Sequence, residues 1–254
     1  MKKYLILILL ILFPIVVGAQ KNKNRYDIVK DATGDYQYKD KDGFKASFST
    51  NIFNDKIYKD DNGNEVSYAK EIWVDVFPRF NGDEKRILAW LVDVFRDNSN
   101  IKEKYDRNIH GDVVYENSST GFNASLSKNI FDEGIYKDSR GNEVKYSKEF
   151  WNDIMSDFRY NDVQVFFWLI DYCEKLDNYS EEYKVDIFGN LQYENNKDGK
   201  ASLSNDIHGN KVYENKSGNK REYTPAVWNR IVDRHKSEKK AFIWLVNRNA
   251  TREE

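Results

Sequence analysis

The chain has 254 residues, of which 40 are basic and 42 acidic, so its formal net charge is −2. Both signs of charge are mixed along the sequence, which argues against a nucleic-acid-binding protein, because such proteins concentrate Lys and Arg on one element. Cys173 is the one cysteine, so an intrachain disulfide is excluded and we expect a buried thiol. Stability must come from buried apolar surface, and 15% of the residues are aromatic.

Residues 1–19 have the pattern of a secretory signal peptide. Lys2 and Lys3 precede an apolar run from Leu5 to Val17, and small residues suit cleavage before Gln20. The run is shorter than the about 20 apolar residues of a membrane-spanning helix, which makes an uncleaved anchor the weaker alternative. We therefore expect a periplasmic or secreted protein that begins with a polar arm, residues 20–25, and has no contact with a membrane after cleavage.

Three long segments of the sequence are similar to one another. Tryptophans recur at a nearly constant spacing in two sets, Trp73, Trp151 and Trp228, and Trp90, Trp168 and Trp244. A fixed period of this length indicates a tandem architecture. The sequence therefore predicts three repeat units of about 77 residues, at 26–104, 105–182 and 183–254.

Each predicted unit begins with short alternating runs and ends with two helical patterns. Turn pairs such as Asp198-Gly199 and Gly209-Asn210 separate the alternating runs, which indicates a meander of antiparallel strands. The period then changes to about 3.6, and Thr224-Pro225 is typical of a helix start. We expect an α+β fold of three tandem units, each a small antiparallel β-meander followed by two amphipathic helices.

A shorter repeat of 20 residues lies within each unit. Asp186–Asn195 recurs as Asp206–Asn215, with glycine, asparagine and tyrosine at matching places. These segments resemble the short Gly/Tyr/Asn-rich β-hairpin repeats of uncharacterised exported bacterial proteins. The resemblance covers about half of the mature chain, and it implies a β-rich scaffold and no reaction.

The residues that could carry chemistry have simpler interpretations. The three histidines, His110, His208 and His235, stand where other copies have phenylalanine, so we expect aromatic rings and no metal ligands. Asp60–Glu65 resembles the start of a calcium loop, but Gly63 stands at the fourth position and the EF-hand requires glycine at the sixth. A hairpin turn is the better interpretation. We predict no enzyme activity, no cofactor and no metal.

Six tyrosines occupy equivalent points of the six hairpins. They can pack in the core, or they can present an amphipathic surface to a partner. The predicted function is an exported, non-enzymatic repeat protein that binds another protein, for instance an immunity protein or an inhibitor of a secreted toxin. The alternative is binding of carbohydrate or cell wall through aromatic surfaces. The speculative binding residues are Tyr38, Tyr58, Tyr115, Tyr136, Tyr193 and Tyr213.

Overall fold

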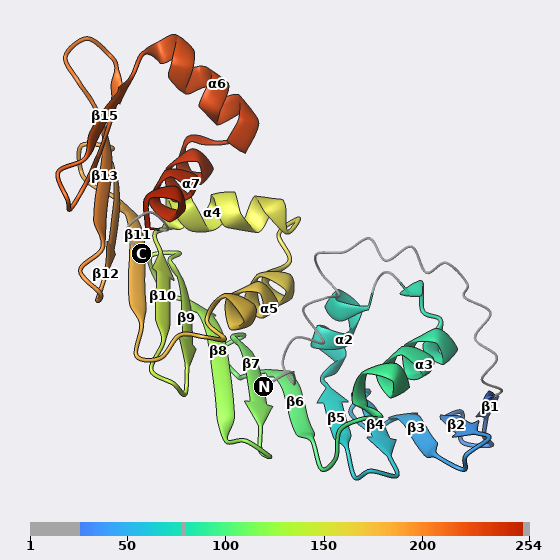
Figure 1. The fold of residues 1–254 in the computed structure, drawn as a ribbon. Coiled ribbons are helices and arrows are strands. Elements are labelled where there is room, and N and C mark those ends of the chain that lie inside the picture. The colour runs from blue at the N-terminus through green and yellow to red at the C-terminus, as the bar shows by residue number, and fades with distance from the viewer. Residues whose placement is uncertain (1–25, 78–79, 251–254) are drawn as a thin grey trace. The chain divides into compact units, whose positions relative to one another are not determined.

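A computed structural model describes residues 26–77 and 80–250 of the chain, which form one mixed β-sheet and helices on it. The fifteen strands of this described part follow one another in chain order within the sheet (Figure 1). The predicted fold class, three tandem units that each have their own antiparallel meander, is therefore wrong. The predicted signal peptide and polar arm, residues 1–25, lie outside the described residues.

The sheet continues because the strand after a helix pair pairs in parallel with the strand before it. β5 (Glu65–Tyr68) pairs with β6 (Lys102–Arg107), and β10 (Glu143–Tyr146) pairs with β11 (Ser180–Val185). The other pairings that we describe are antiparallel. A helix pair between two strands allows this change, since parallel strands need a long crossover connection.

A buried asparagine fixes the first parallel pairing. The Asn64 Oδ1 atom accepts a hydrogen bond from the backbone N–H of Ile101 at 2.9 Å. Its Nδ2 atom donates to the carbonyl oxygens of Phe95 and Asn98, both at 3.0 Å. Asn64 thus joins the end of one helix and the start of β6 to the preceding turn, and Asn142 is its counterpart before β11.

Two compact units divide the chain, and we describe each by itself. Unit 1 comprises the residues up to Ser125 together with Phe166–Glu174, and unit 2 comprises Leu126–Val165 and the residues from Lys175 onward. Two elements cross a boundary between units, β8 (Phe122–Lys128) and α5 (Asp162–Tyr172). The other elements of unit 1 are β1 (Tyr26–Lys30), β2 (Tyr36–Asp40), β3 (Lys45–Thr50), β4 (Lys56–Asp60), β5, α2 (Lys70–Val76), α3 (Glu84–Phe95), β6 and β7 (Val113–Asn117). Those of unit 2 are β9 (Gly134–Asp138), β10, α4 (Lys148–Asp157), β11, β12 (Leu191–Asn195), β13 (Lys200–Asn205), β14 (Lys211–Asn215), β15 (Lys220–Tyr223), α6 (Pro225–His235) and α7 (Glu238–Ala250).

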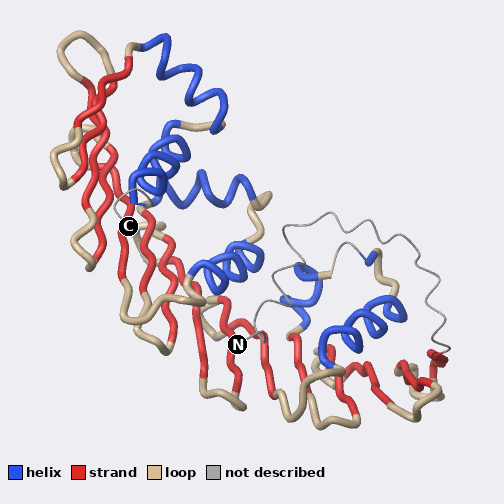
Figure 2. Tube along the Cα trace, viewed as in Figure 1, coloured by secondary structure: helices blue, strands red, loops and turns tan. Residues whose placement is uncertain are grey.

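In each unit the helices lie on one face of the sheet and enclose the core there (Figure 2). The strands alternate accordingly: Ala46 and Phe48 of β3 are buried, whereas Ser47 and Ser49 between and beyond them are only half-buried. The helices meet the core strands with apolar stripes, such as Leu88 in α3, which is fully buried. None of the helices in the described part is both long and apolar enough to cross a membrane.

Candidate functional site

Five turns expose an isoleucine followed by an aromatic ring, and we call them the apolar turns. In each turn Ile is the second of five residues and Phe or His is the third. The isoleucines are 90–95% exposed and the phenylalanines 69–82% exposed. The apolar turns are residues 51–55, 108–112, 129–133, 186–190 and 206–210, and the exposed pairs are Ile52-Phe53, Ile109-His110, Ile130-Phe131, Ile187-Phe188 and Ile207-His208.

A side chain at the first position holds each apolar turn. In the β3–β4 turn, Asn51 Oδ1 accepts hydrogen bonds from the backbone N–H groups of Phe53 and Asp55, both at 2.9 Å. Asn54 at the fourth position has a φ of 67°, a left-handed conformation that Asn and Gly adopt most readily. These bonds are made within the turn, so the Ile and Phe side chains are left pointing away from the frame that carries them.

The β11–β12 turn repeats this frame with aspartate. Asp186 Oδ1 accepts from the N–H groups of Phe188 at 2.8 Å and Asn190 at 2.9 Å, and the Asn190 side chain donates to Asp186 Oδ2 at 2.9 Å. The hydrogen bonds from Asn190 lower the pKa of Asp186, so its carboxylate stays ionised and keeps accepting. The apolar pair is thus presented on a preorganised loop.

Within each unit, the apolar turns lie at one edge of the sheet. Antiparallel neighbours turn at alternate edges, and a parallel pairing restores the direction of the strand before the helices. In unit 1 the β3–β4 and β6–β7 turns therefore share an edge, and in unit 2 the β8–β9, β11–β12 and β13–β14 turns do. Strands lie about 4.8 Å apart, which places neighbouring apolar turns of a unit about 10 or 14 Å from each other.

Turns at the opposite edge of the sheet have the same frame without the apolar pair, and we call them the polar turns. In the β4–β5 turn, Asp60 Oδ1 accepts from the N–H groups of Asn62 at 2.9 Å and Asn64 at 3.1 Å. In the β9–β10 turn, Asp138 Oδ1 accepts from Arg140 at 2.9 Å in the same way. The second and third residues there are polar: Lys41-Asp42, Asp61-Asn62, Ser118-Ser119, Ser139-Arg140, Asn196-Lys197 and Lys216-Ser217. The turn frame therefore does not require Ile or Phe.

The six tyrosines proposed from the sequence lie elsewhere. All are buried, with side chains 0–9% exposed: Tyr38, Tyr58, Tyr115, Tyr136, Tyr193 and Tyr213. The Tyr58 hydroxyl donates to Asp60 Oδ2 at 2.8 Å, and burial raises the pKa of this phenol well above its usual range. Their burial fits the packing role that the sequence also allowed. The structure brings together at the surface the Ile–aromatic pairs instead.

The histidines have two different environments. His110 and His208 are exposed in apolar turns, whereas the His235 ring stacks on Trp244 with ring centroids 4.7 Å apart. Burial lowers the pKa of His235, and its Nε2 atom is buried without a hydrogen-bond partner. Across residues 26–77 and 80–250, no three His, Cys, Asp or Glu side chains lie where they could hold a metal ion. The Cys173 thiol is buried.

Part of the sheet face away from the helices carries charges that pair with one another. In unit 2, Lys145 lies 3.3 Å from Glu133 and 3.0 Å from Glu182, and Lys184 lies 3.0 Å from Glu182 and 2.7 Å from Glu194. The ion pairs with Lys145 hold the pKa of Glu182 below its usual value, although burial opposes this shift. A ladder of satisfied pairs is a solvated surface of low binding potential.

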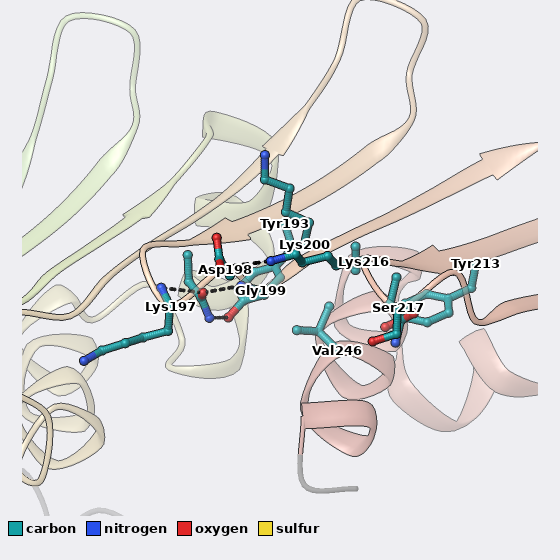
Figure 3. A pocket seen from close by; sticks show the side chains of 12 residues that line it. Tyr193, Lys197, Asp198, Gly199, Lys200, Tyr213, Lys216, Ser217 and Val246 are labelled. Carbon is teal, nitrogen blue, oxygen red and sulfur yellow. Dashed lines mark hydrogen bonds and ion pairs between the residues drawn. The ribbon is translucent and has the colours of Figure 1, made fainter. Parts of the chain in front are cut away.

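A cavity of about 380 Å³ opens beside two polar turns of unit 2 (Figure 3). Tyr193, Tyr213 and Val246 form its apolar part, and Lys216 pairs with Asp198 at 3.0 Å on its rim. The counterpart of the cavity-lining Tyr213 in unit 1 is Tyr58. There the Phe95 ring packs against the Tyr58 ring, with ring centroids 5.5 Å apart. Lys197, Lys200 and Ser217 also line the cavity.

Comparisons with known proteins do not identify a family. No protein-family model matches the chain, and no curated protein does. Among solved structures, the SAS-4 (dCPAP) TCP domain of Drosophila melanogaster, in complex with a proline-rich motif of Ana2, is 9% identical with a TM-score of 0.19, covering 78% of this chain and 90% of that one. The TCP10 domain of Danio rerio CPAP with a STIL peptide is 7% identical with a TM-score of 0.18, covering 80% and 96%. Likeness at this level carries no argument about fold or function.

Proposed function

We propose that this protein is an exported, non-enzymatic protein that binds another protein through its apolar turns. The observation that carries the proposal is the contrast between the apolar turns and the polar turns. The same hydrogen-bonded turn holds Ile187-Phe188 at one edge and Asn196-Lys197 at the other. An isoleucine that is 93% exposed at a place where polar residues fold equally well has a use outside the fold.

The geometry suits a protein partner with several small apolar pockets. Three apolar turns in unit 2 present their pairs at intervals of about 10 and 14 Å, which is within the width of a standard protein interface. Burying one isoleucine or phenylalanine side chain contributes about 1.5–3 kcal/mol. Because the turn is already held by Asn or Asp, little conformational entropy is lost on binding.

The acidic groups beside the apolar pairs are paired within the chain. Asp132 of the β8–β9 turn pairs with Lys128 and Lys148, and Glu133 pairs with Lys145. Recognition of the partner therefore rests on the exposed apolar side chains. An immunity protein or an inhibitor of a secreted toxin is one such binding protein, and export itself is proposed from residues 1–19.

Binding of carbohydrate or cell wall is less well supported. Sugar platforms most often use the broad face of tryptophan, and none of the six tryptophans is exposed: Trp151 and Trp228 are buried and the other four are half-buried. The exposed rings of Phe53, Phe131 and Phe188 each stand beside an exposed isoleucine, which has no ring to stack on a sugar. Protein binding therefore remains the proposal.

Photo-crosslinking from paired positions tests this function. A benzophenone amino acid is placed at Phe131 or Phe188, and at Ser139 or Lys197 as exposed controls on polar turns of the same unit. The full chain is then crosslinked in the culture that produces it. We expect one discrete protein adduct from the apolar turns and none from the controls. Adducts of equal yield from both edges, or none from either, would contradict the proposal.

A further inference from the structure

At two junctions in the chain, the strand before a helix pair is bound in parallel by the strand after it. The edge of β15 that faces away from β14 is a third copy of this junction, without a strand bound to it in the described residues. At the first, Glu65 N–H donates to the Ile101 carbonyl at 2.7 Å and Ala69 N–H donates to the Tyr105 carbonyl at 2.9 Å. At the second, Glu143 and Ser147 make the same bonds to Tyr179 and Tyr183, both at 2.8 Å. The matching residues at the end of unit 2 are Lys220 and Thr224, and β15 pairs only with β14 in the described part of the chain.

Side chains beside the edge of β15 are more exposed than their counterparts at the two internal junctions, where a ring of the parallel strand covers them. Tyr68 is fully buried where its ring stacks on Tyr105, with centroids 5.1 Å apart, and Tyr146 is 3% exposed where it stacks on Tyr183. Tyr223 takes this place in β15 and is half-buried.

The following helix shows the same difference. Ile72 of α2 and Phe150 of α4 are fully buried, and the Phe150 ring lies 5.6 Å from the Tyr183 ring of the parallel strand. Val227 of α6 stands at their position and is 36% exposed. Tyr223 and Val227 thus form an apolar surface whose two counterparts are each covered by a tyrosine from a parallel strand.

Asn219 is a further point of similarity between the edge of β15 and the two internal junctions. Its counterparts Asn64 and Asn142 are each 1% exposed and accept a hydrogen bond from the N–H that begins the parallel strand, at 2.9 and 3.0 Å. Asn219 itself is exposed. The edge therefore offers a side-chain acceptor, backbone groups and an apolar surface at the places that bind a strand at both internal junctions, although Arg221 replaces the buried Val66 and Val144.

We propose that β15 binds an extended segment of a partner protein, which runs parallel to it and carries Lys or Arg opposite Glu222 and an aromatic residue opposite Tyr223. The charge follows from the second junction, where Lys145 stands at the position of Glu222 and pairs with the acidic Glu182 at 3.0 Å. Strand addition of this kind gains affinity from main-chain hydrogen bonds and specificity from alternate side chains.

A second copy of the chain is the poorer occupant. Its β1 would be the matching strand, because Ile28 pairs with Tyr38 as Tyr105 pairs with Tyr115. In that register Asp27 would stand opposite Glu222, and like charges at directly opposite positions destabilise a strand pair. The charged residues of β15 thus disfavour self-pairing, as edge strands commonly do.

The probe is a peptide with the sequence of Ile101–Arg107 in which Lys102 is replaced by serine, the residue that Ser180 supplies at the second junction. It places Lys104 opposite Glu222 and Tyr105 opposite Tyr223, and it puts no lysine opposite Lys220. Labelled at its N-terminus, it is titrated to about 1 mM against the full chain and followed by fluorescence anisotropy. We expect saturable binding. N-methyl groups at Glu103 and Tyr105, whose N–H groups face β15, should abolish it, whereas N-methyl groups at the serine and at Lys104 should not.

Two variants of the protein complete the test. Glu222→Pro removes an edge-facing N–H at a position where an edge strand tolerates proline, and it should weaken peptide binding at least about tenfold. Glu222→Lys should prefer the peptide in which Lys104 is replaced by Glu. The proposal is overturned by the absence of saturable binding, by equal loss with both methylated peptides, or by self-association of the chain that Glu222→Pro abolishes. None of these outcomes involves the apolar turns.

Discussion

Replacing Asn64 by alanine should destabilise unit 1 strongly, because its side chain lies within hydrogen-bond distance of four partners there. Its Nδ2 donates to Asp60 Oδ2 at 2.8 Å and to the carbonyl oxygens of Phe95 and Asn98, and its Oδ1 accepts from Ile101. A typical hydrogen bond contributes about 1 kcal/mol, and a buried group left unsatisfied costs about 1–3 kcal/mol. Some carbonyls will find water, so we expect a loss of about 3 kcal/mol, or about 10 °C in Tm.

Urea denaturation followed by circular dichroism measures this loss, and two further variants calibrate it. Asn64→Asp keeps the acceptor for Ile101 but sets a buried carboxylate against Asp60 Oδ2 and two carbonyl oxygens, so it should destabilise at least as much as Asn64→Ala. Asn219→Ala removes the exposed counterpart beside β15 and should cost less than about 0.5 kcal/mol. If Asn64→Ala and Asn219→Ala lowered the free energy of unfolding equally, the role assigned to Asn64 in holding β6 would be refuted.

Three further changes have expected outcomes. Arg96→Ala removes the guanidinium 2.6 Å from the buried Asp40 carboxylate and should lower the free energy of unfolding by about 2–3 kcal/mol in urea denaturation. This is less than for a fully buried ion pair, because the Arg96 side chain is 38% exposed. If an Arg96→Ala/Asp40→Asn double variant recovered none of this loss, the ion pair would not be its cause. Gly134→Ala places a Cβ in steric clash with the Trp151 ring and should lower stability by about 1–3 kcal/mol, and an unchanged melting curve would show that the ring moves freely. Since burial lowers the pKa of His235, the unfolded state binds its proton more readily, so stability should fall as pH drops below about 6.5; His235→Phe should flatten this dependence, and an unchanged pH profile would count against it.

Local structure could be predicted from the sequence where the signal was itself local. The helix start predicted at Thr224-Pro225 agrees with α6, which begins at Pro225. The continuity of the sheet could not be predicted, because it depends on bonds between residues far apart, such as Asn64 and Ile101. The polar segment between α3 and β6 looks like a linker in the sequence. Only the structure shows that it leads to a strand, β6, that pairs with β5.

The candidate site was missed for a related reason. The recurring tyrosines and the recurring Ile–aromatic pairs have the same period in the sequence. A recurring aromatic residue suggests core packing, whether its side chain lies in the core or in solvent. Tyr58 is buried, whereas Phe53, five residues earlier, is 72% exposed. A comparison of the two kinds of turn could have found the difference, since Asn51 and Asp60 begin similar turns but only the first is followed by Ile and Phe.

The central claim is that the apolar turns bind a protein, and the affinity for the crosslinked partner tests it most directly. In the decisive variant, Ile187→Asn and Phe188→Lys give the β11–β12 turn the residues of the polar β12–β13 turn while its Asp186 frame is kept. Isothermal titration calorimetry should show at least about a tenfold rise in Kd, since a buried pair of this size contributes more than 1.4 kcal/mol, with Tm unchanged. An unchanged Kd for this variant and for the matching changes at Ile130 and Phe131 would contradict the claim.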